Sequence, residues 1–322
     1  MKKRLWIWSG IVAVVILLLL GGLVSRIPWG KAASPNLLTS NNLIEYGKNP
    51  GLGVRRLQRQ GYTGKGVTLA IVDQPMRRDH PEYKNAPITY YEVRPEDKGM
   101  RSSNSSLHGP AVTSLLLGTS IGVAPDVTLF YVAMPSWQLD QNAHAESLYR
   151  LIDVNRSLPD GKKIRAISIS DGGDPSEKNP EAFQKAIADA EAAGMWVFTV
   201  DFPDLRLLPL GIDPYKDKDD PTNYRPASWV RGIPSGQEKH LWFPTEPRTL
   251  ATELEPGGYR YDEQGGMSWG MPYLVGVVAL GLQEDPALTR ANAVKYLWES
   301  ATPWQDGRII NPRGFVEMVK QN

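Results

Sequence analysis

The chain has 322 residues, enough for one large α/β domain or two small ones. Charged residues make up 22% of it and the formal net charge is +1, so the composition gives no sign of a nucleic-acid partner. Cysteine is absent, which excludes disulfides and thiolate metal sites.

The first 34 residues differ in composition from the rest of the chain. Three basic residues, Lys2 to Arg4, precede an apolar stretch at residues 5–24. As a helix, this stretch would span roughly 30 Å, the thickness of the hydrocarbon core of a membrane. We therefore predict a retained single-pass anchor in the cell membrane, with the remainder of the chain outside the cytoplasm. The alternative is a cleaved signal peptide and a secreted product, although signal peptides have apolar cores of only about 7–15 residues.

After this segment we predict a linker at residues 35–52 and one globular domain at residues 53–322, which begins with a short helix. Within the domain, short β-branched runs alternate with helical patterns. The predicted strands are 67–72, 127–132, 164–169 and 195–200, and the predicted helices are 109–117, 145–154, 179–193, 273–282 and 291–300. This alternation predicts an α/β fold with a parallel sheet, whose functional residues lie where strands end. Asp73 directly follows the first predicted strand.

The segment from Gly266 to Gly276 has a tight glycine turn, then Ser268, then a helix that is apolar on all sides. Pro272 suits the first turn of such a helix. A serine at this helix end lies among free N–H groups in a positive field, which suits a nucleophile whose intermediate carries an oxyanion. The alternative is that Ser268 is an ordinary N-cap.

Three segments, in this order, resemble the active-site motifs of the subtilisin-like serine proteases. They are Gly61–Asp73 with the following His80-Pro81, His108–Gly118 with Gly122–Pro125, and Gly266–Gly276. The resemblance runs from about Gly53 to Val319. It implies a three-layer fold, with helices on both faces of a parallel sheet, and a serine endopeptidase that acts on peptides or proteins. The histidine of the His80-Pro81 pair is structural in that family.

The resemblance assigns a catalytic triad. Ser268 would be the nucleophile, which needs a base, and His108 would be that base. Asp73 would hold the His108 tautomer and stabilise the imidazolium, and the order Asp, His, Ser is that of the subtilisins. An esterase elbow is formally present at Gly266–Gly270, but its triad would need a histidine after the serine, and none follows His240.

Several positions depart from the family pattern. The family carries an oxyanion-stabilising Asn after a central strand, where this chain has Asp201 as the closest substitute. An ionised carboxylate cannot donate a hydrogen bond, whereas a protonated one could. Losing one such donor costs ~10²–10³ in rate, and the Ser268 N–H would remain as a donor. Trp269 either narrows the cleft or packs in the core. No room is left between the predicted anchor and Gly61 for the family's usual propeptide.

The remaining signals concern the substrate cleft and metals. Ser170, Asp171 and Gly172 resemble the strand end that pairs with an extended peptide in the family. Asp171 stands where a leucine is usual, and it either attracts a basic side chain or is a solvated turn residue. The acidic loop at 213–221 has no calcium-ligand spacing, so we expect no cofactor and no metal, and calcium is not supported. The alternative function is a pseudoprotease that binds a peptide or partner protein through a vestigial triad.

Overall fold

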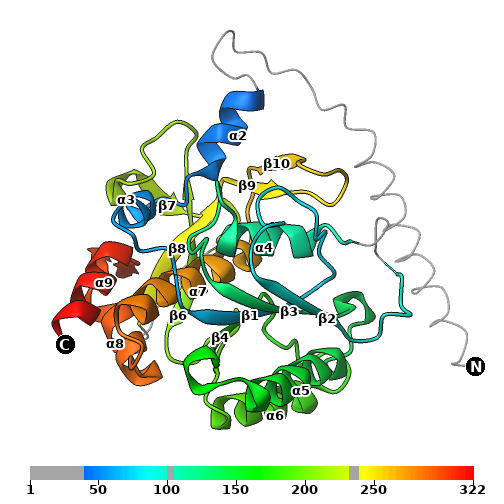
Figure 1. The fold of residues 1–322 in the computed structure, drawn as a ribbon. Coiled ribbons are helices and arrows are strands. Elements are labelled where there is room, and N and C mark those ends of the chain that lie inside the picture. The colour runs from blue at the N-terminus through cyan, green and yellow to red at the C-terminus, as the bar shows by residue number, and fades with distance from the viewer. Residues whose placement is uncertain (1–39, 100–104, 232–238) are drawn as a thin grey trace, which may run out of the picture. The chain divides into compact units, whose positions relative to one another are not determined.

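In the computed structural model, five apolar strands form a parallel sheet in the order β2-β3-β1-β4-β5 (Figure 1). They are β1 Thr68–Asp73, β2 Ile88–Glu92, β3 Thr128–Ala133, β4 Ile164–Ile169 and β5 Trp196–Phe198. Every residue of the central strand β1 is buried, as expected for a strand covered on both faces. The structure describes residues 40–99, 105–231 and 239–322.

Helices cover both faces of this sheet because alternate strand residues point to opposite sides. Leu69 and Ile71 belong to one core cluster, with apolar residues of α4 (His108–Leu117) and α7 (Met267–Glu284). Ala70 and Val72 belong to the other, with residues of α5 (Asn142–Ser157) and α6 (Pro180–Ala192). Figure 1 shows α5 and α6 side by side in green, on the face away from α4 and α7. The predicted parallel sheet with helices on both faces is therefore confirmed.

A second five-stranded sheet, in the order β11-β12-β8-β6-β7, was not predicted. Its members are β6 Arg206–Ile212, β7 Tyr224–Pro226, β8 His240–Glu246, β11 Thr302–Trp304 and β12 Gly307–Ile309. The inner pairs β6–β8 and β8–β12 are parallel, and the edge strands β7 and β11 are antiparallel. Pro209, Gly211 and Pro244 interrupt the strand signal of β6 and β8 in the sequence, which explains why it was missed.

The N-terminal part of the described chain differs from the predicted linker. Residues 40–48 form helix α2 (Ser40–Lys48), which packs beside the hairpin of β9 (Arg248–Ala251) and β10 (Tyr259–Asp262). Thr249 Oγ1 donates a hydrogen bond of 2.7 Å to the Ile44 carbonyl and ties the helix to this hairpin. The predicted entry helix is present as α3 (Val54–Arg59), and α8 (Arg290–Glu299) and α9 (Pro312–Gln321) follow near the C-terminus.

No helix within residues 40–99, 105–231 and 239–322 is long and apolar enough to cross a membrane. The predicted anchor at residues 5–24 lies outside the described residues.

Candidate active site

Asp73 ends strand β1 at the carboxyl edge of the parallel sheet. Its side chain is 5% exposed, and its Oδ1 accepts two hydrogen bonds, one of 2.7 Å from the Gln74 N–H and one of 2.6 Å from His108 Nδ1. The neighbouring strand β4 pairs Ile169 with Val72, so Ser170 follows β4 beside Asp73. The ends of the central strands therefore bring these polar groups together, as predicted for a parallel sheet.

His108 is the first residue of helix α4. Ser106, the residue before the N-cap Leu107, accepts hydrogen bonds of 3.2 Å at its Oγ from the N–H groups of His108 and Gly109, and so satisfies two free N–H groups of the helix end. A Cβ at Gly109 would lie 2.4 Å from the Gln74 carbonyl oxygen and 2.7 Å from that of Pro75. Glycine is thus required for the helix end to rest on the loop after β1, and this contact brings the imidazole to Asp73.

The environment of His108 favours its protonated form. Burial lowers the pKa of His108, but the charge of Asp73 and its hydrogen bond outweigh that effect and raise it above the ordinary value of 6.5. The charge of Asp171 adds to the rise, and that of Arg260 opposes it. Because Nδ1 donates to Asp73, Nε2 is the ring nitrogen that can accept a proton.

Ser268 is the second residue of α7. It contacts Ser170, which directly follows strand β4. The helix starts six residues before the predicted 273, so Pro272 lies inside it rather than in its first turn. Pro272 has no N–H to bond the Ser268 carbonyl four residues earlier. Ser170 Oγ donates to that carbonyl instead, at 3.0 Å, and Ser268 Oγ lies 3.5 Å from the Ser170 carbonyl oxygen.

Trp269 links the serine and histidine segments. It is 5% exposed, its indole Nε1 donates to Asp262 Oδ2 at 2.9 Å, and its ring centroid lies 5.1 Å from that of His108. Trp269 is therefore a buried residue whose indole ring packs against the imidazole of His108. The predicted hydrogen bond between His108 and Ser268 is not among the contacts of the described chain, where the Ser268 hydroxyl faces Ser170.

Ser170 and Asp171 line a small cavity of about 80 Å³ together with Asp73 and His108. Asp171 Oδ1 accepts hydrogen bonds from the N–H groups of Gly172 and Gly173, at 2.7 and 3.1 Å. The predicted cleft segment thus adjoins the Asp73–His108 pair, and its turn is stabilised by the Asp171 side chain itself.

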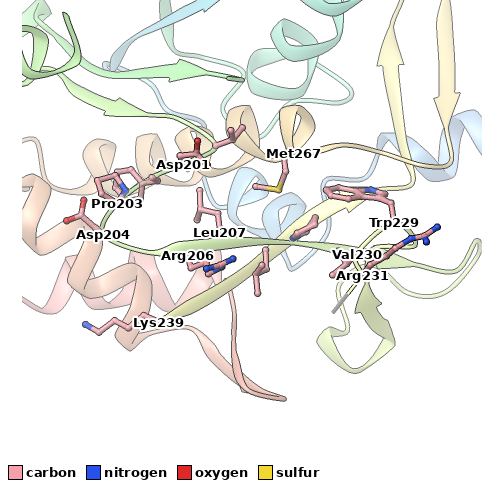
Figure 2. Close-up of a pocket in the computed structure, with 14 residues that line it drawn as sticks. Asp201, Pro203, Asp204, Arg206, Leu207, Trp229, Val230, Arg231, Lys239 and Met267 are labelled. Carbon is pink, nitrogen blue, oxygen red and sulfur yellow. The ribbon is translucent and has the colours of Figure 1, made fainter. Parts of the chain in front are cut away.

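Asp201 follows β5 and is exposed. A Cβ at Gly172 would lie 2.1 Å from Asp201 Oδ2, so the carboxylate rests against the predicted cleft segment. Asp201 also lines a larger pocket of about 860 Å³ whose wall includes Met267, the residue before Ser268. Figure 2 shows Asp201, Leu207 and Met267 around this pocket, each from a different part of the chain.

His144 also lines the small cavity, and the sequence did not predict it as a site residue. It lies on α5, is 2% exposed and lines the cavity with His108 and Asp171. It falls in no motif, and the only signal for it is its place between two alanines on the buried face of the helix. His80, by contrast, is structural, as the resemblance implied, because it is buried and its Nε2 bonds the Gly258 carbonyl at 2.9 Å.

The acidic loop at residues 213–221 uses its carboxylates within the protein. Asp219 Oδ1 accepts from the Gly53 N–H at 2.9 Å, Asp220 Oδ1 accepts from the Thr222 N–H at 2.8 Å, and Asp213 pairs with Arg225 at 3.1 Å. These three carboxylates therefore stabilise the turns of the loop and its contact with the segment at Gly53.

A model of the subtilase family matches residues 64–200, a range that holds Asp73 and His108 and ends before Ser268. Among curated proteins, the minor extracellular protease Vpr of Bacillus subtilis (strain 168) is 27% identical over 143 residues, which are 41% of this chain and 17% of that protein. The alkaline serine exoprotease A of Vibrio alginolyticus is 22% identical over 283 residues, 80% of this chain and 46% of that one. This chain thus spans less than half the length of either relative.

Among solved structures, the prenylagaramide maturation protease PagA superposes with a TM-score of 0.60. The match covers 83% of this chain and 98% of that one at 19% identity, so the likeness is one of fold.

Proposed function

Because this chain is a divergent member of the subtilisin-like serine protease family, we propose that it is a serine endopeptidase that hydrolyses peptide bonds through an acyl-enzyme. The observation that carries the proposal is the 2.6 Å hydrogen bond between buried Asp73 and His108 Nδ1. Trp269, the residue after Ser268 at the start of a buried helix, packs on the His108 ring with the centroids 5.1 Å apart. This arrangement supplies an oriented base and a nucleophile, the two groups that acyl transfer needs.

In the proposed reaction, His108 Nε2 takes the proton from Ser268 Oγ as the oxygen attacks the substrate carbonyl. Asp73 stabilises the imidazolium, which then gives its proton to the leaving amine as the acyl-enzyme forms. Water repeats the sequence and releases the acyl group, so Ser268 and His108 return to their starting states. For the attack, the Ser268 hydroxyl turns from the Ser170 carbonyl toward His108, since catalytic hydrogen bonds of this kind tighten when substrate binds.

The oxyanion of the intermediate would lie near the start of α7. The Ser268 N–H belongs to the first turn of that helix, where N–H groups have no partner within the helix. Asp201 takes the place of the family's asparagine, and an ionised carboxylate there opposes the developing negative charge. We therefore expect an enzyme slower than its relatives by ~10²–10³, the cost of one oxyanion donor.

The second candidate is a pseudoprotease that binds a peptide or partner protein with the same cleft. Two observations favour it, namely the orientation of the Ser268 hydroxyl toward Ser170 and the presence of Asp201. The Asp73–His108 hydrogen bond favours the enzyme, because peptide binding alone does not need an oriented base.

Labelling by a fluorophosphonate probe separates the two candidates, since the probe reacts only with an activated serine. We expect the wild type to be labelled and Ser268→Ala to remain unlabelled. The matched control is Ser176→Ala, at an exposed serine that bonds only within its own turn. If the wild type takes up no probe at any pH between about 5 and 9, a range within which histidines change from protonated to neutral, the endopeptidase proposal is overturned.

The oxyanion site has its own test. Asp201→Asn should raise kcat by ~10-fold or more, because it restores a donor at the position where the family has one. The measurement is kcat with a peptide substrate across the same pH range. An unchanged kcat for Asp201→Asn, together with an unlabelled wild type, would favour the pseudoprotease.

We further propose that the domain acts outside the cytoplasm, held by a single membrane anchor at residues 5–24. The support is the length of this apolar stretch and the basic residues before it. Cell fractionation with N-terminal sequencing tests it, and we expect an intact N-terminus in the membrane fraction. A soluble product beginning near Ala33 would instead show a cleaved signal peptide and a secreted enzyme.

A further inference from the structure

The cavity beside His108 holds a second carboxylate–imidazole pair that the proposed reaction does not use. Its walls come from the ends of β1, β3 and β4 and from α5, and its volume is about 80 Å³. One water needs roughly 10–15 Å³ of such space, so the cavity has room for the end of a side chain. The pair consists of His144 and Asp171.

His144 is an unusual wall residue because its ring nitrogens lack hydrogen-bond partners among the described residues. The residue is only 2% exposed, so solvent does not replace those partners freely. One face of the ring packs on Phe183, with the centroids 4.7 Å apart. Burial lowers the pKa of His144, against the charges of Asp171 and Asp73, so the ring is neutral at neutral pH. A neutral imidazole that lacks partners offers one nitrogen to a hydrogen-bond donor.

Asp171 presents its second oxygen to the same space. Its Oδ1 is held by the N–H groups of Gly172 and Gly173, while Oδ2 lies 3.4 Å from His144 Nε2, beyond an ordinary hydrogen bond. About a third of the Asp171 side chain is exposed, so the carboxylate is partly open to solvent. In the part of the chain that the structure describes, no lysine or arginine pairs with Asp171.

The surroundings of Asp171 are also acidic. Burial and then the charge of Asp171 raise the pKa of Glu177, so these two carboxyl groups act on each other. Arg260, whose charge acts on His108, lies 3.6 Å from Asp262 and is paired with that carboxylate. A cationic group that entered the cavity would therefore meet a negative field.

We propose that Asp171 and His144 form a specificity site for a lysine or arginine side chain of the bound peptide. Asp171 Oδ2 supplies the opposite charge and His144 supplies a neutral acceptor, which together match a cation that carries several N–H donors. The site adjoins His108 and continues the Ser170–Gly172 segment, so the basic residue lies close to the scissile bond. This inference rests on the proposed function, because it requires that a peptide occupies this cleft.

The test measures kcat/KM for peptides that carry lysine or arginine at one of the four residues before the scissile bond, against norleucine or citrulline at the same place. We expect the wild type to prefer the basic residue at one position by about 10-fold, a typical effect of a partly buried charge pair. Asp171→Asn should reduce that ratio to about 2 or less, since the amide keeps an oxygen for the two glycine N–H groups but loses the charge. His144→Leu should reduce the ratio by a smaller factor.

The matched control is Asp174→Asn, which removes the charge of an exposed carboxylate of the same segment that is hydrogen-bonded to Ser176 of its own turn. It should keep the full preference. The inference is overturned if the wild type treats basic and neutral peptides alike, if Asp171→Asn keeps the preference, or if Asp174→Asn loses it equally.

A binding measurement separates this inference from the proposed function. Anisotropy of the same labelled peptides with Ser268→Ala reports binding without hydrolysis. Tighter binding of the basic peptide that depends on Asp171 supports the specificity site even if the wild type proves inactive. Hydrolysis of basic and neutral peptides at equal rates, with equal binding, would overturn the specificity site and leave the endopeptidase intact.

Discussion

Two carboxylate–imidazole pairs share one cavity, and they differ in what surrounds them. Asp73 and His108 are joined by a hydrogen bond of 2.6 Å, and the pKa of His108 is raised. Asp171 and His144 approach to 3.4 Å without a hydrogen bond, and burial lowers the pKa of His144. The same two residue types thus give a hydrogen-bonded imidazole with a raised pKa in one place and an imidazole with a lowered pKa in the other. Geometry and desolvation, and not composition, decide the role of each pair.

The largest expected effect comes from removing the charge of each carboxylate in turn. Asp73→Asn should lower kcat by ~10⁴, because an amide no longer selects the His108 tautomer that leaves Nε2 free. Asp171→Asn should change kcat far less, since Asp171 is held by glycine N–H groups and not by an imidazole. Steady-state kinetics of both variants provide the measurement. Losses of similar size would mean that the two pairs act as one catalytic unit.

The second effect comes from the backbone contact that holds the first pair together. In Gly109→Ala the new Cβ would lie 2.4 Å from the Gln74 carbonyl oxygen, so the start of α4 must move away from Asp73. A displacement of about 1 Å can cost ~10²-fold in rate, and we expect a loss of that order with a lowered Tm.

The matched control is Gly161→Ala, where a Cβ would meet nothing within 4 Å. It should leave both rate and Tm close to wild type. A fully active Gly109→Ala would show that the position of α4 does not set the geometry of the first pair.

These two pairs also show how far the sequence predicts the site. Asp73, His108 and Ser268 stand in motifs, and the end of each β-branched run places polar residues at one edge of the sheet. His144 has no such signal, because a single histidine on a helix becomes part of the cavity only when α5 packs on β3 and β1. The second sheet was missed for a different reason, since Pro209 and Pro244 stand in its inner strands β6 and β8, where prolines are rarely found.

The third effect is a shift in the pH dependence of catalysis. His108 must be neutral to act as base, and its pKa is raised above 6.5, so kcat/KM should fall as the pH drops through a midpoint above that value. The charge of Asp171 contributes to the rise, so Asp171→Asn should move this acid limb to lower pH. Profiles of kcat/KM with a neutral peptide measure the limb, and Asp174→Asn is the control. A shift to higher pH in Asp171→Asn would contradict the coupling between the two pairs.

The smallest effect is on stability, and here the two histidines should act with opposite signs. The pKa of His144 is lowered in the folded chain, so as the pH falls through the unfolded value of 6.5 the unfolded state binds the proton first and stability is lost. The pKa of His108 is raised, so its contribution is fully present below 6.5 and is lost as the pH rises through the folded value. His144→Leu should therefore resist acid better than the wild type, and His108→Gln should resist it less well.

Urea midpoints of the three proteins between about pH 5 and pH 8, where histidines titrate, provide the measurement. The comparison is made within each protein, as the change of its midpoint with pH, so that the packing cost of either substitution cancels. Both variants retain His80, whose pKa is also lowered by burial, and its contribution is therefore common to all three curves. If His144→Leu and the wild type lose the same stability on acidification, His144 is not held neutral by its surroundings. The two pairs would then differ only in the hydrogen bond between Asp73 and His108, and not in how burial shifts the pKa of the histidine.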